Sequence, residues 1–218
     1  MIGLGATGCS LLPLVSTLPI GTLSLIDGDT VEAANLCRQA LYGQNDLGAL
    51  KVEKAAQRTE HLHGARRIIQ HPVFIDAVNI EDLLGNVTMV ADCTDDIHAR
   101  ELISHYCERM RIPLFTGAIH GAQLQVIGLH TSSGPGLVAL RSFFPAKAGM
   151  AQDACDMRNV PIEIPAVTAA LMVRRIAAFL RHGPITTTMD VVDMERGSWF
   201  TIAPPDDHDE LIADLHDR

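Results

Sequence analysis

Apolar and polar positions along the chain follow two periods in turn, one typical of strands and one typical of helices. Short β-rich apolar runs predict strands at 21–26, 67–70, 87–91, 113–116 and 122–129. The intervening segments predict helices at 8–17, 51–62, 96–110 and 165–181. This alternation favours an α/β fold, with a doubly wound, mostly parallel, Rossmann-like sheet and helices on both of its faces.

The C-terminal part of the chain shows a different pattern. Segments 186–192 and 198–202 predict a closing hairpin, which would form a C-terminal β extension of the sheet. We expect residues 1–203 to form one domain. Residues 204–218 are rich in Asp, and we expect them to be an exposed acidic tail.

A glycine-rich loop lies almost at the start of the chain, where Gly3, Gly5 and Gly8 form the pattern G-x-G-x-x-G. Such a loop normally joins a buried strand to a helix whose N-terminus receives a phosphate. Asp27 follows Gly8 by 19 residues, close to the spacing of about 20 at which a carboxylate binds a ribose hydroxyl. Together they favour a nucleotide over a plain strand-to-helix turn, although NAD, FAD and ATP all fit.

Two cations and a cluster of carboxylates discriminate among these nucleotides. Arg38 and Lys51 are suited to phosphates, Arg as a planar fork and Lys as a mobile point charge. Asp95 is suited to Mg²⁺, which prefers oxygen ligands together with substrate phosphates. A dehydrogenase needs neither a metal nor cations at a triphosphate, whereas adenylyl transfer uses both. Taken singly, Arg38 and Lys51 fit solvated charges equally well, and Asp95 fits a helix N-cap.

Composition and charge exclude several classes of partner. The formal net charge of −9 disfavours nucleic acid, whose binding draws on clustered Lys and Arg. No apolar run approaches the ~18 residues of a membrane span, and the N-terminus lacks a signal-peptide pattern. The five cysteines include no C-x-x-C pair, which argues against a disulfide framework or a zinc site. We therefore expect a cytoplasmic protein without zinc and without nucleic-acid or membrane partners.

In combination, these motifs resemble those of the HesA/MoeB/ThiF branch of the ubiquitin-activating-enzyme-like superfamily. The resemblance rests on GxGxxG at 3–8, LxDxDxV at 25–31, NLxRQ at 35–39, GxxK at 48–51 and DxTD at 92–95. Members of this family use MgATP to adenylate the C-terminal carboxylate of a ubiquitin-like or sulfur-carrier protein ending in Gly-Gly. The resemblance implies this activity for the present chain, acting as a homodimer.

The resemblance also implies roles for individual residues. Asp27 would bind the ribose of ATP, and Asp95 would coordinate Mg²⁺. The phosphates would be lined by Asn35, Arg38, Gln39 and Lys51, while Gly3, Gly5, Gly8 and Asp29 would complete the nucleotide site.

Cys155 is a second candidate for chemistry. It is followed by a basic residue, Asn, an apolar residue and Pro, as is the thioester cysteine of ubiquitin-activating enzymes. It would attack the acyl-adenylate and hold the acyl group as a thioester. The remaining cysteines are expected to be buried packing thiols; they are Cys9, Cys37, Cys93 and Cys107.

Among the departures from the family pattern, the one at the N-terminus puts activity in question. Family members usually begin with a helical R-x-x-R-Q segment whose arginine reaches the ATP of the partner subunit, and no such segment precedes Gly3. Only Met1 and Ile2 stand before the loop, where a strand of about five residues is typical. We therefore expect the chain to be short at its N-terminus.

Other functions stay open at this point. A non-catalytic ThiF-like scaffold subunit is consistent with the missing arginine segment. A NAD-dependent Rossmann oxidoreductase is consistent with the glycine loop alone. A dehydratase of the same fold that adenylates a modified tRNA base is disfavoured by the net charge of −9.

Overall fold

The structure is a computed structural model that describes residues 1–62, 67–131, 140–143 and 160–204. Its helices are α1 (Ala6–Val15), α2 (Lys51–Thr59), α3 (Ile80–Leu84), α4 (Ile97–Met110), α5 (Leu140–Phe143) and α6 (Glu163–His182), with short 3₁₀ turns η1 (Ala33–Asn35) and η2 (Gln44–Asp46). Its strands are β1 (Thr22–Ile26), β2 (Arg67–His71), β3 (Val90–Asp92), β4 (Leu114–His120), β5 (Gln123–Leu129), β6 (Met189–Asp193) and β7 (Ser198–Ile202). The predicted elements are all present, with ends shifted by a few residues.

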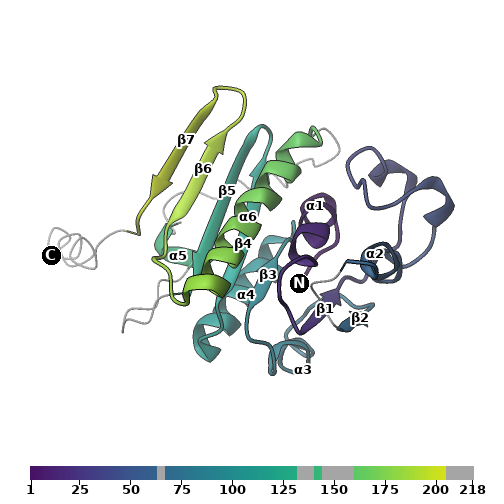
Figure 1. Cartoon of the computed structure of the whole chain (residues 1–218), viewed down its shortest axis with the longest axis horizontal. Helices are drawn as coiled ribbons and strands as arrows, with labels where there is room; N and C mark the ends of the chain where they lie inside the picture. The colour runs from purple at the N-terminus through teal and green to yellow at the C-terminus, as the bar shows by residue number, and fades with distance from the viewer. Residues whose placement is uncertain (63–66, 132–139, 144–159, 205–218) are drawn as a thin grey trace, which may run out of the picture.

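The sheet has a parallel and an antiparallel part. Strands β1 and β2 pair in parallel, and β3, β4, β5, β6 and β7 lie side by side in that order. The β3–β4 pair is parallel, whereas β5, β6 and β7 each run antiparallel to the strand before them (Figure 1). The α/β fold with a parallel sheet is therefore confirmed. The antiparallel part contains the predicted C-terminal hairpin, as β6 and β7, and also β5, which was not predicted to run antiparallel to β4.

The residues before the glycine loop join the two parts of the sheet. Ile2 makes parallel bridges to Ile26 of β1 and to Asp92 of β3. Its N–H donates to the Ala91 carbonyl at 2.9 Å, and its own carbonyl accepts from the Cys93 N–H at 2.8 Å. The chain therefore starts in the middle of the sheet, between β3 and β1 (Figure 1).

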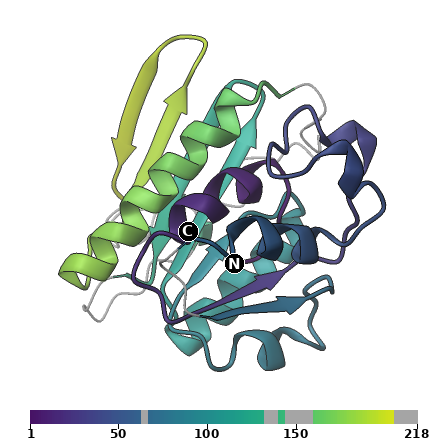
Figure 2. The ribbon, with the colours of Figure 1, turned by 45° about the vertical axis from the view of Figure 1, so that its right-hand side comes forward.

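Two hydrophobic cores cover the two faces of the sheet, because successive strand residues point to opposite sides. Leu25 and Phe115 belong to the core formed with α1, α2 and α6, whereas Ile26 and Leu114 belong to the core formed with α3 and α4. Figure 2 shows α6 lying along the strands with α1 beside it. None of the helices in the described part of the chain is long and apolar enough to cross a membrane.

Candidate functional site

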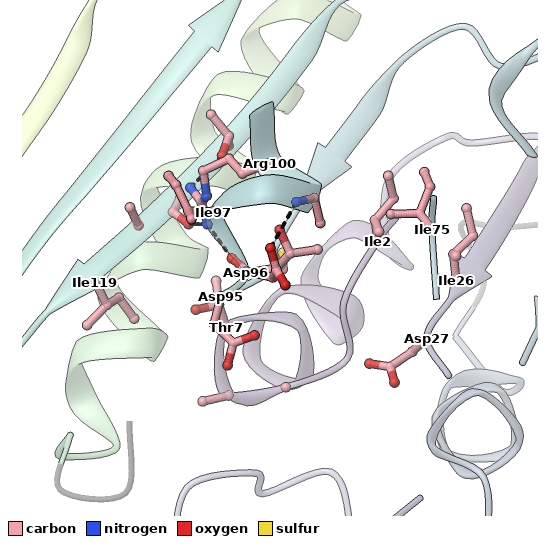
Figure 3. Close-up of a pocket in the computed structure, with 18 of the residues that line it drawn as sticks. Ile2, Thr7, Ile26, Asp27, Ile75, Asp95, Asp96, Ile97, Arg100 and Ile119 are labelled. Atoms are coloured by element: carbon pink, nitrogen blue, oxygen red, sulfur yellow. Dashed lines mark hydrogen bonds between the residues drawn. The ribbon is translucent and has the colours of Figure 1, made fainter. Parts of the chain in front are cut away.

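A cavity of about 1160 Å³ lies at the carboxyl ends of the parallel strands (Figure 3). Its wall is formed by the start of α1, the end of β1, the turn after β3, the first turns of α4, and β4. Ligands bind at this edge in parallel α/β sheets. It brings together eight of the residues singled out from the sequence: Gly5, Asp27, Asp29, Asn35, Arg38, Gln39, Lys51 and Asp95.

The glycine loop places the N-terminus of α1 against the cavity. Gly3 has φ +83°, and a side chain there would stand 2.8 Å from the Cys93 carbonyl oxygen. A Cβ on Gly8 would lie 2.1 Å from the Gly3 carbonyl oxygen. These two glycines therefore permit close backbone packing, and neither lines the cavity, whereas Gly5 does. Ala6 and Thr7 follow Gly5 along the wall, so the first turn of the helix lies at the cavity. The N–H groups of a first turn have no partner within the helix and stabilise a nearby anion.

Asp27 follows β1 and is held by two backbone donors. Its Oδ2 accepts from the Leu4 N–H at 2.6 Å, and its Oδ1 accepts from the Asp29 N–H at 2.8 Å. Burial raises the pKa of this carboxyl, against the lowering effect of the two hydrogen bonds. Each oxygen retains a lone pair, so the carboxylate suits a ligand that offers hydroxyl groups.

Asn35, the last residue of η1, and Arg38, in the turn after it, form a second wall. The Arg38 Nη2 donates to Asn35 Oδ1 at 3.1 Å, and its Nη1 donates to the Ala34 carbonyl at 2.7 Å. Gln39 is 3% exposed, and its amide oxygen has no hydrogen-bond partner within the part of the chain that the structure describes. A buried polar atom that lines a cavity without a protein partner indicates a place for a ligand or for water.

Lys51 is the first residue of α2 and is held by Asp29. Its Nζ lies 2.7 Å from Asp29 Oδ2, and it is 4% exposed, whereas the Asp29 side chain is 53% exposed. A lysine in the first turn of a helix is disfavoured by the helix dipole. The ion pair offsets this effect and keeps the ammonium group at the cavity wall.

The end of β3 and the turn after it carry three carboxylates with three different environments. Asp92 is fully buried. Asp96 is the N-cap of α4 and accepts from the His98 and Ala99 N–H groups; the bonds from Ala99 and His98 lower its pKa. Because Asp96 takes the N-cap position, Asp95 is not the cap. Asp95 is exposed at the cavity, and it makes no hydrogen bond or ion pair among the residues the structure describes.

The donor set around Asp95 fits a magnesium nucleotide better than a metal held by protein alone. The described residues contain no group of three or more His, Cys, Asp or Glu side chains placed to hold a metal ion. Mg²⁺ typically takes one or two protein carboxylates and completes its shell with phosphates and water. One carboxylate that faces the cavity together with Arg38 and Lys51 fits this kind of arrangement.

The cysteines divide between core and surface. Cys9, Cys93 and Cys107 are buried, and burial raises the pKa of Cys9 and of Cys107 to about 12. They remain protonated at neutral pH and do not act as nucleophiles. The expectation of a buried Cys37 is wrong, because in the turn after η1 its neighbour Arg38 takes the buried place and Cys37 is left exposed. Cys155 lies outside the described residues.

Among the cavity residues that were not singled out from the sequence, two carry side chains with a possible role in binding. Phe74, in the loop after β2, lies against Gly28; Arg100, on α4, reaches to β4. The position of Arg100 four residues after the N-cap Asp96 is the only local signal for it, since residues four apart share a helix face. Phe74 follows a strand and carries no motif.

Comparison with known proteins gives consistent results. The model of the ThiF family matches residues 1–211. The adenylyltransferase and sulfurtransferase uba4 of Pyricularia oryzae is 34% identical over 135 residues, which is 62% of this chain and 28% of that protein. The adenylyltransferase and sulfurtransferase MOCS3-2 of Zea mays is 28% identical over 172 residues, which is 78% of this chain and 35% of that protein. The chain therefore spans much less than two thirds of either relative.

Solved structures share the fold at low sequence identity. The crystal structure of E. coli MccB with ATP has a TM-score of 0.73 and 17% identity, with 94% of this chain and 63% of that chain covered. The structure of PaaA has a TM-score of 0.72 and 19% identity, with 93% and 71% covered.

Proposed function

Because the ThiF family model spans residues 1–211, the chain belongs to the ThiF family, and we propose that it is an MgATP-dependent adenylyltransferase. Its substrate is the C-terminal carboxylate of a ubiquitin-like or sulfur-carrier protein that ends in Gly-Gly. One observation carries the proposal: Asp27, Arg38, Lys51 and Asp95 line one cavity with the N-terminus of α1. The names of the relatives, adenylyltransferase and sulfurtransferase, support it.

The base and ribose of ATP lie at the apolar end of the cavity. Ile2, Ile26 and Ile75 gather there beside Asp27 (Figure 3). Val73 and Phe74 extend this apolar wall. Asp27 accepts the ribose hydroxyls, because its oxygens are fixed by backbone donors and it offers only acceptors when ionised.

The phosphates lie between α1, Arg38 and Lys51. Arg38 has N–H groups that are still available to a phosphate after its bonds to Asn35 and Ala34. The Lys51 ammonium group exchanges its ion pair with Asp29 for one with a phosphate, which carries the larger charge. Asp95 would hold Mg²⁺, which would neutralise charge on the phosphates and on the departing pyrophosphate. The helix N-terminus contributes fixed dipoles that need no reorganisation.

The acyl substrate enters from the side of β4 and β5. Neither strand contributes a charged group to the cavity wall there, which is formed by Thr116, Gly117, Ala118, Ile119, Gln125 and Ile127. Beyond it, the register places Gln125 next to Val191 of β6, and Val191 next to Phe200 of β7. Phe200 is 61% exposed. The extended C-terminal tail of the carrier protein can follow the row of Phe200, Val191 and Gln125 into the cavity, while the folded part of the carrier lies against the sheet.

In the reaction, an oxygen of the carrier carboxylate attacks the α-phosphorus of ATP. The bond from that phosphorus to the bridging oxygen breaks, and pyrophosphate leaves with the electron pair. The protein contributes mainly alignment and charge stabilisation, because the nucleophile is already an anion. Cys155 then takes the acyl group as a thioester in a second step, with release of AMP. The enzyme acts as a homodimer in the cytoplasm.

ATP–pyrophosphate exchange with a carrier ending in Gly-Gly tests the proposal. Exchange that is lost in Asp95→Ala and retained in Cys155→Ala assigns adenylation to the first residue and acyl transfer to the second. If ATP binds but no carrier supports exchange, the scaffold alternative is correct. Tighter binding of NAD than of MgATP would favour the oxidoreductase. In that alternative, Lys51 and Asp95 would have no role in the reaction.

A further inference from the structure

Arg100 connects the turn after β3 with the neighbouring strand β4. Its Nη1 donates to the Thr116 hydroxyl at 2.8 Å, and its Nη2 donates to the Gly117 carbonyl at 2.9 Å. The same Nη2 donates to the Thr94 carbonyl. The side chain is 11% exposed. One guanidinium therefore binds backbone carbonyls on both sides of the gap between the two strands.

Asp92, the last residue of β3, binds the same group of residues. Its Oδ1 accepts from the Thr94 N–H at 3.0 Å and from the Thr94 hydroxyl at 2.7 Å, and its Oδ2 accepts from the Thr116 hydroxyl at 2.7 Å. Arg100 Nε lies 3.8 Å from the same Oδ2. The buried carboxylate is thus neutralised, and Thr94 is fixed at its N–H, its hydroxyl and its carbonyl.

The segment fixed in this way carries Asp95. On its N-terminal side Thr94 is tied to Asp92 and Arg100, and on its C-terminal side Asp96 is tied to the first N–H groups of α4. Asp95 lies between two anchored residues, and its own side chain is left for the cavity (Figure 3). The direction of its carboxylate therefore depends on the hydrogen bonds of Arg100.

We propose that Arg100 is a positioning residue, which sets the Asp95 carboxylate for the magnesium ion of MgATP by clamping Thr94 to Thr116 and Gly117. This inference rests on the proposed function and deepens it. Groups that orient a metal ligand from behind typically contribute 10- to 100-fold in metal affinity or activity. Lysine cannot replace arginine here, since only a planar guanidinium has N–H groups placed to donate to all three acceptors at once.

The test compares nucleotide affinity with and without the metal, by calorimetry of ATP in Mg²⁺ and of ATP in EDTA. In Arg100→Lys we expect the affinity for MgATP to fall about 10-fold or more. The affinity for ATP in EDTA should stay within about twofold of wild type, because a change that small does not indicate a direct contact with the nucleotide. Mn²⁺ binding to the protein–ATP complex, followed by electron paramagnetic resonance, should weaken in parallel. Arg109→Met is the matched control, because Arg109 lies on the same helix and stacks on Tyr106 away from the cavity.

A second variant controls for misfolding of the single Arg100 variant. Removing Arg100 leaves the Asp92 charge buried without a partner, so Arg100→Met is combined with Asp92→Asn, and the Thr116 hydroxyl can turn to accept from the new amide. This double variant should fold and show the same selective loss of MgATP affinity.

Three results would overturn the inference. MgATP affinity equal to wild type in both folded variants would show that Asp95 needs no such support. Equal loss of ATP affinity in Mg²⁺ and in EDTA would make Arg100 a direct nucleotide contact. A wild-type protein that gains nothing from Mg²⁺ would refute the magnesium part of the proposed function itself, and the inference with it.

Discussion

Removing the aromatic ring of Phe74 should weaken ATP binding while leaving the fold intact. The ring lines the apolar end of the cavity beside Asp27 and is 64% exposed, so one of its faces is free for a base. Stacking of a base on an aromatic side chain contributes about 1–3 kcal/mol. Because the ring lies at the rim, we take the lower part, about 1–2 kcal/mol, which corresponds to about 5- to 30-fold in affinity.

The assay is the KM for ATP in pyrophosphate exchange, together with the affinity measured by calorimetry. Phe74→Ala should raise KM by this factor and leave kcat nearly unchanged, since stacking acts equally on ground and transition states. The free energy of unfolding should change by less than about 0.5 kcal/mol, as for most surface positions. Phe74→Trp should restore affinity. Val78→Ala is the control, because Val78 is 89% exposed and lies outside the cavity lining.

Gly28 provides an independent test of the same ring. A Cβ at this position would stand 2.6 Å from Cδ2 and 2.8 Å from Cε2 of Phe74, so Gly28→Ala must displace the ring. It should raise the KM for ATP in the wild type and have no further effect in Phe74→Ala, because the two substitutions act through one group. Gly21→Ala is the control, since nothing lies within 4 Å of a Cβ there. An unchanged KM in Phe74→Ala, or additive effects of the two substitutions, would refute the reasoning.

Further predictions concern charge and backbone. Lys51→Met should lower exchange activity by about 100-fold or more through loss of charge stabilisation. Lys54→Met, on the same helix, should leave exchange activity unchanged. Equal activity of the two variants in steady-state assays would contradict the role of Lys51 in binding phosphate. Arg175→Met should destabilise the protein by about 1.5–3 kcal/mol in urea denaturation, because Arg175 Nη2 lies 2.7 Å from Asp190, which is 1% exposed and still keeps Arg174 at 2.8 Å. Burial acts to raise the pKa of Asp190, but Arg175 and hydrogen bonds from β7 outweigh it and lower that pKa. This contribution to stability is therefore complete above the ordinary Asp pKa of about 3.9 and is lost as pH falls below it, which acid titration of the unfolding free energy checks. Gly3→Ala should cost at least about 1 kcal/mol in the same denaturation assay, because φ is +83° and a Cβ would meet the Cys93 carbonyl.

The part of the site that could be predicted from the sequence is the part carried by short motifs. Residues 35–39 and 92–95 each supply their groups within one turn of chain, so spacing alone places them together. Asp27 was predictable because the carboxyl ends of parallel strands meet at one edge. The hairpin of β6 and β7 was predictable because two short β-rich runs follow one another closely in the sequence.

The rest depends on register between segments distant in sequence. Arg100 meets Thr116 across 16 residues and Asp92 meets Thr116 across 24, and no local pattern encodes these pairs. The contact of Phe74 with Gly28 likewise arises only when the loop after β2 folds over the end of β1. The roles of Asp95 and Asp96 could not be separated either, because which of two adjacent acids caps a helix depends on where the helix begins.

The charge of the cavity leads to a final prediction about the metal. Seven acidic side chains line it against three basic ones, which leaves a formal charge of −4. Two of the three cations are already matched, Lys51 by Asp29 and Arg100 by Asp92. A free triphosphate would therefore enter a negative field, and Mg²⁺ removes two charges before the phosphates reach Asp95. We expect ATP in EDTA to bind at least about 10-fold more weakly than MgATP, a difference of about 1.4 kcal/mol. Asp95→Asn should reduce this difference, because it removes one charge that repels free ATP and the carboxylate that attracts the metal. A larger difference in Asp95→Asn than in the wild type would place the metal away from Asp95.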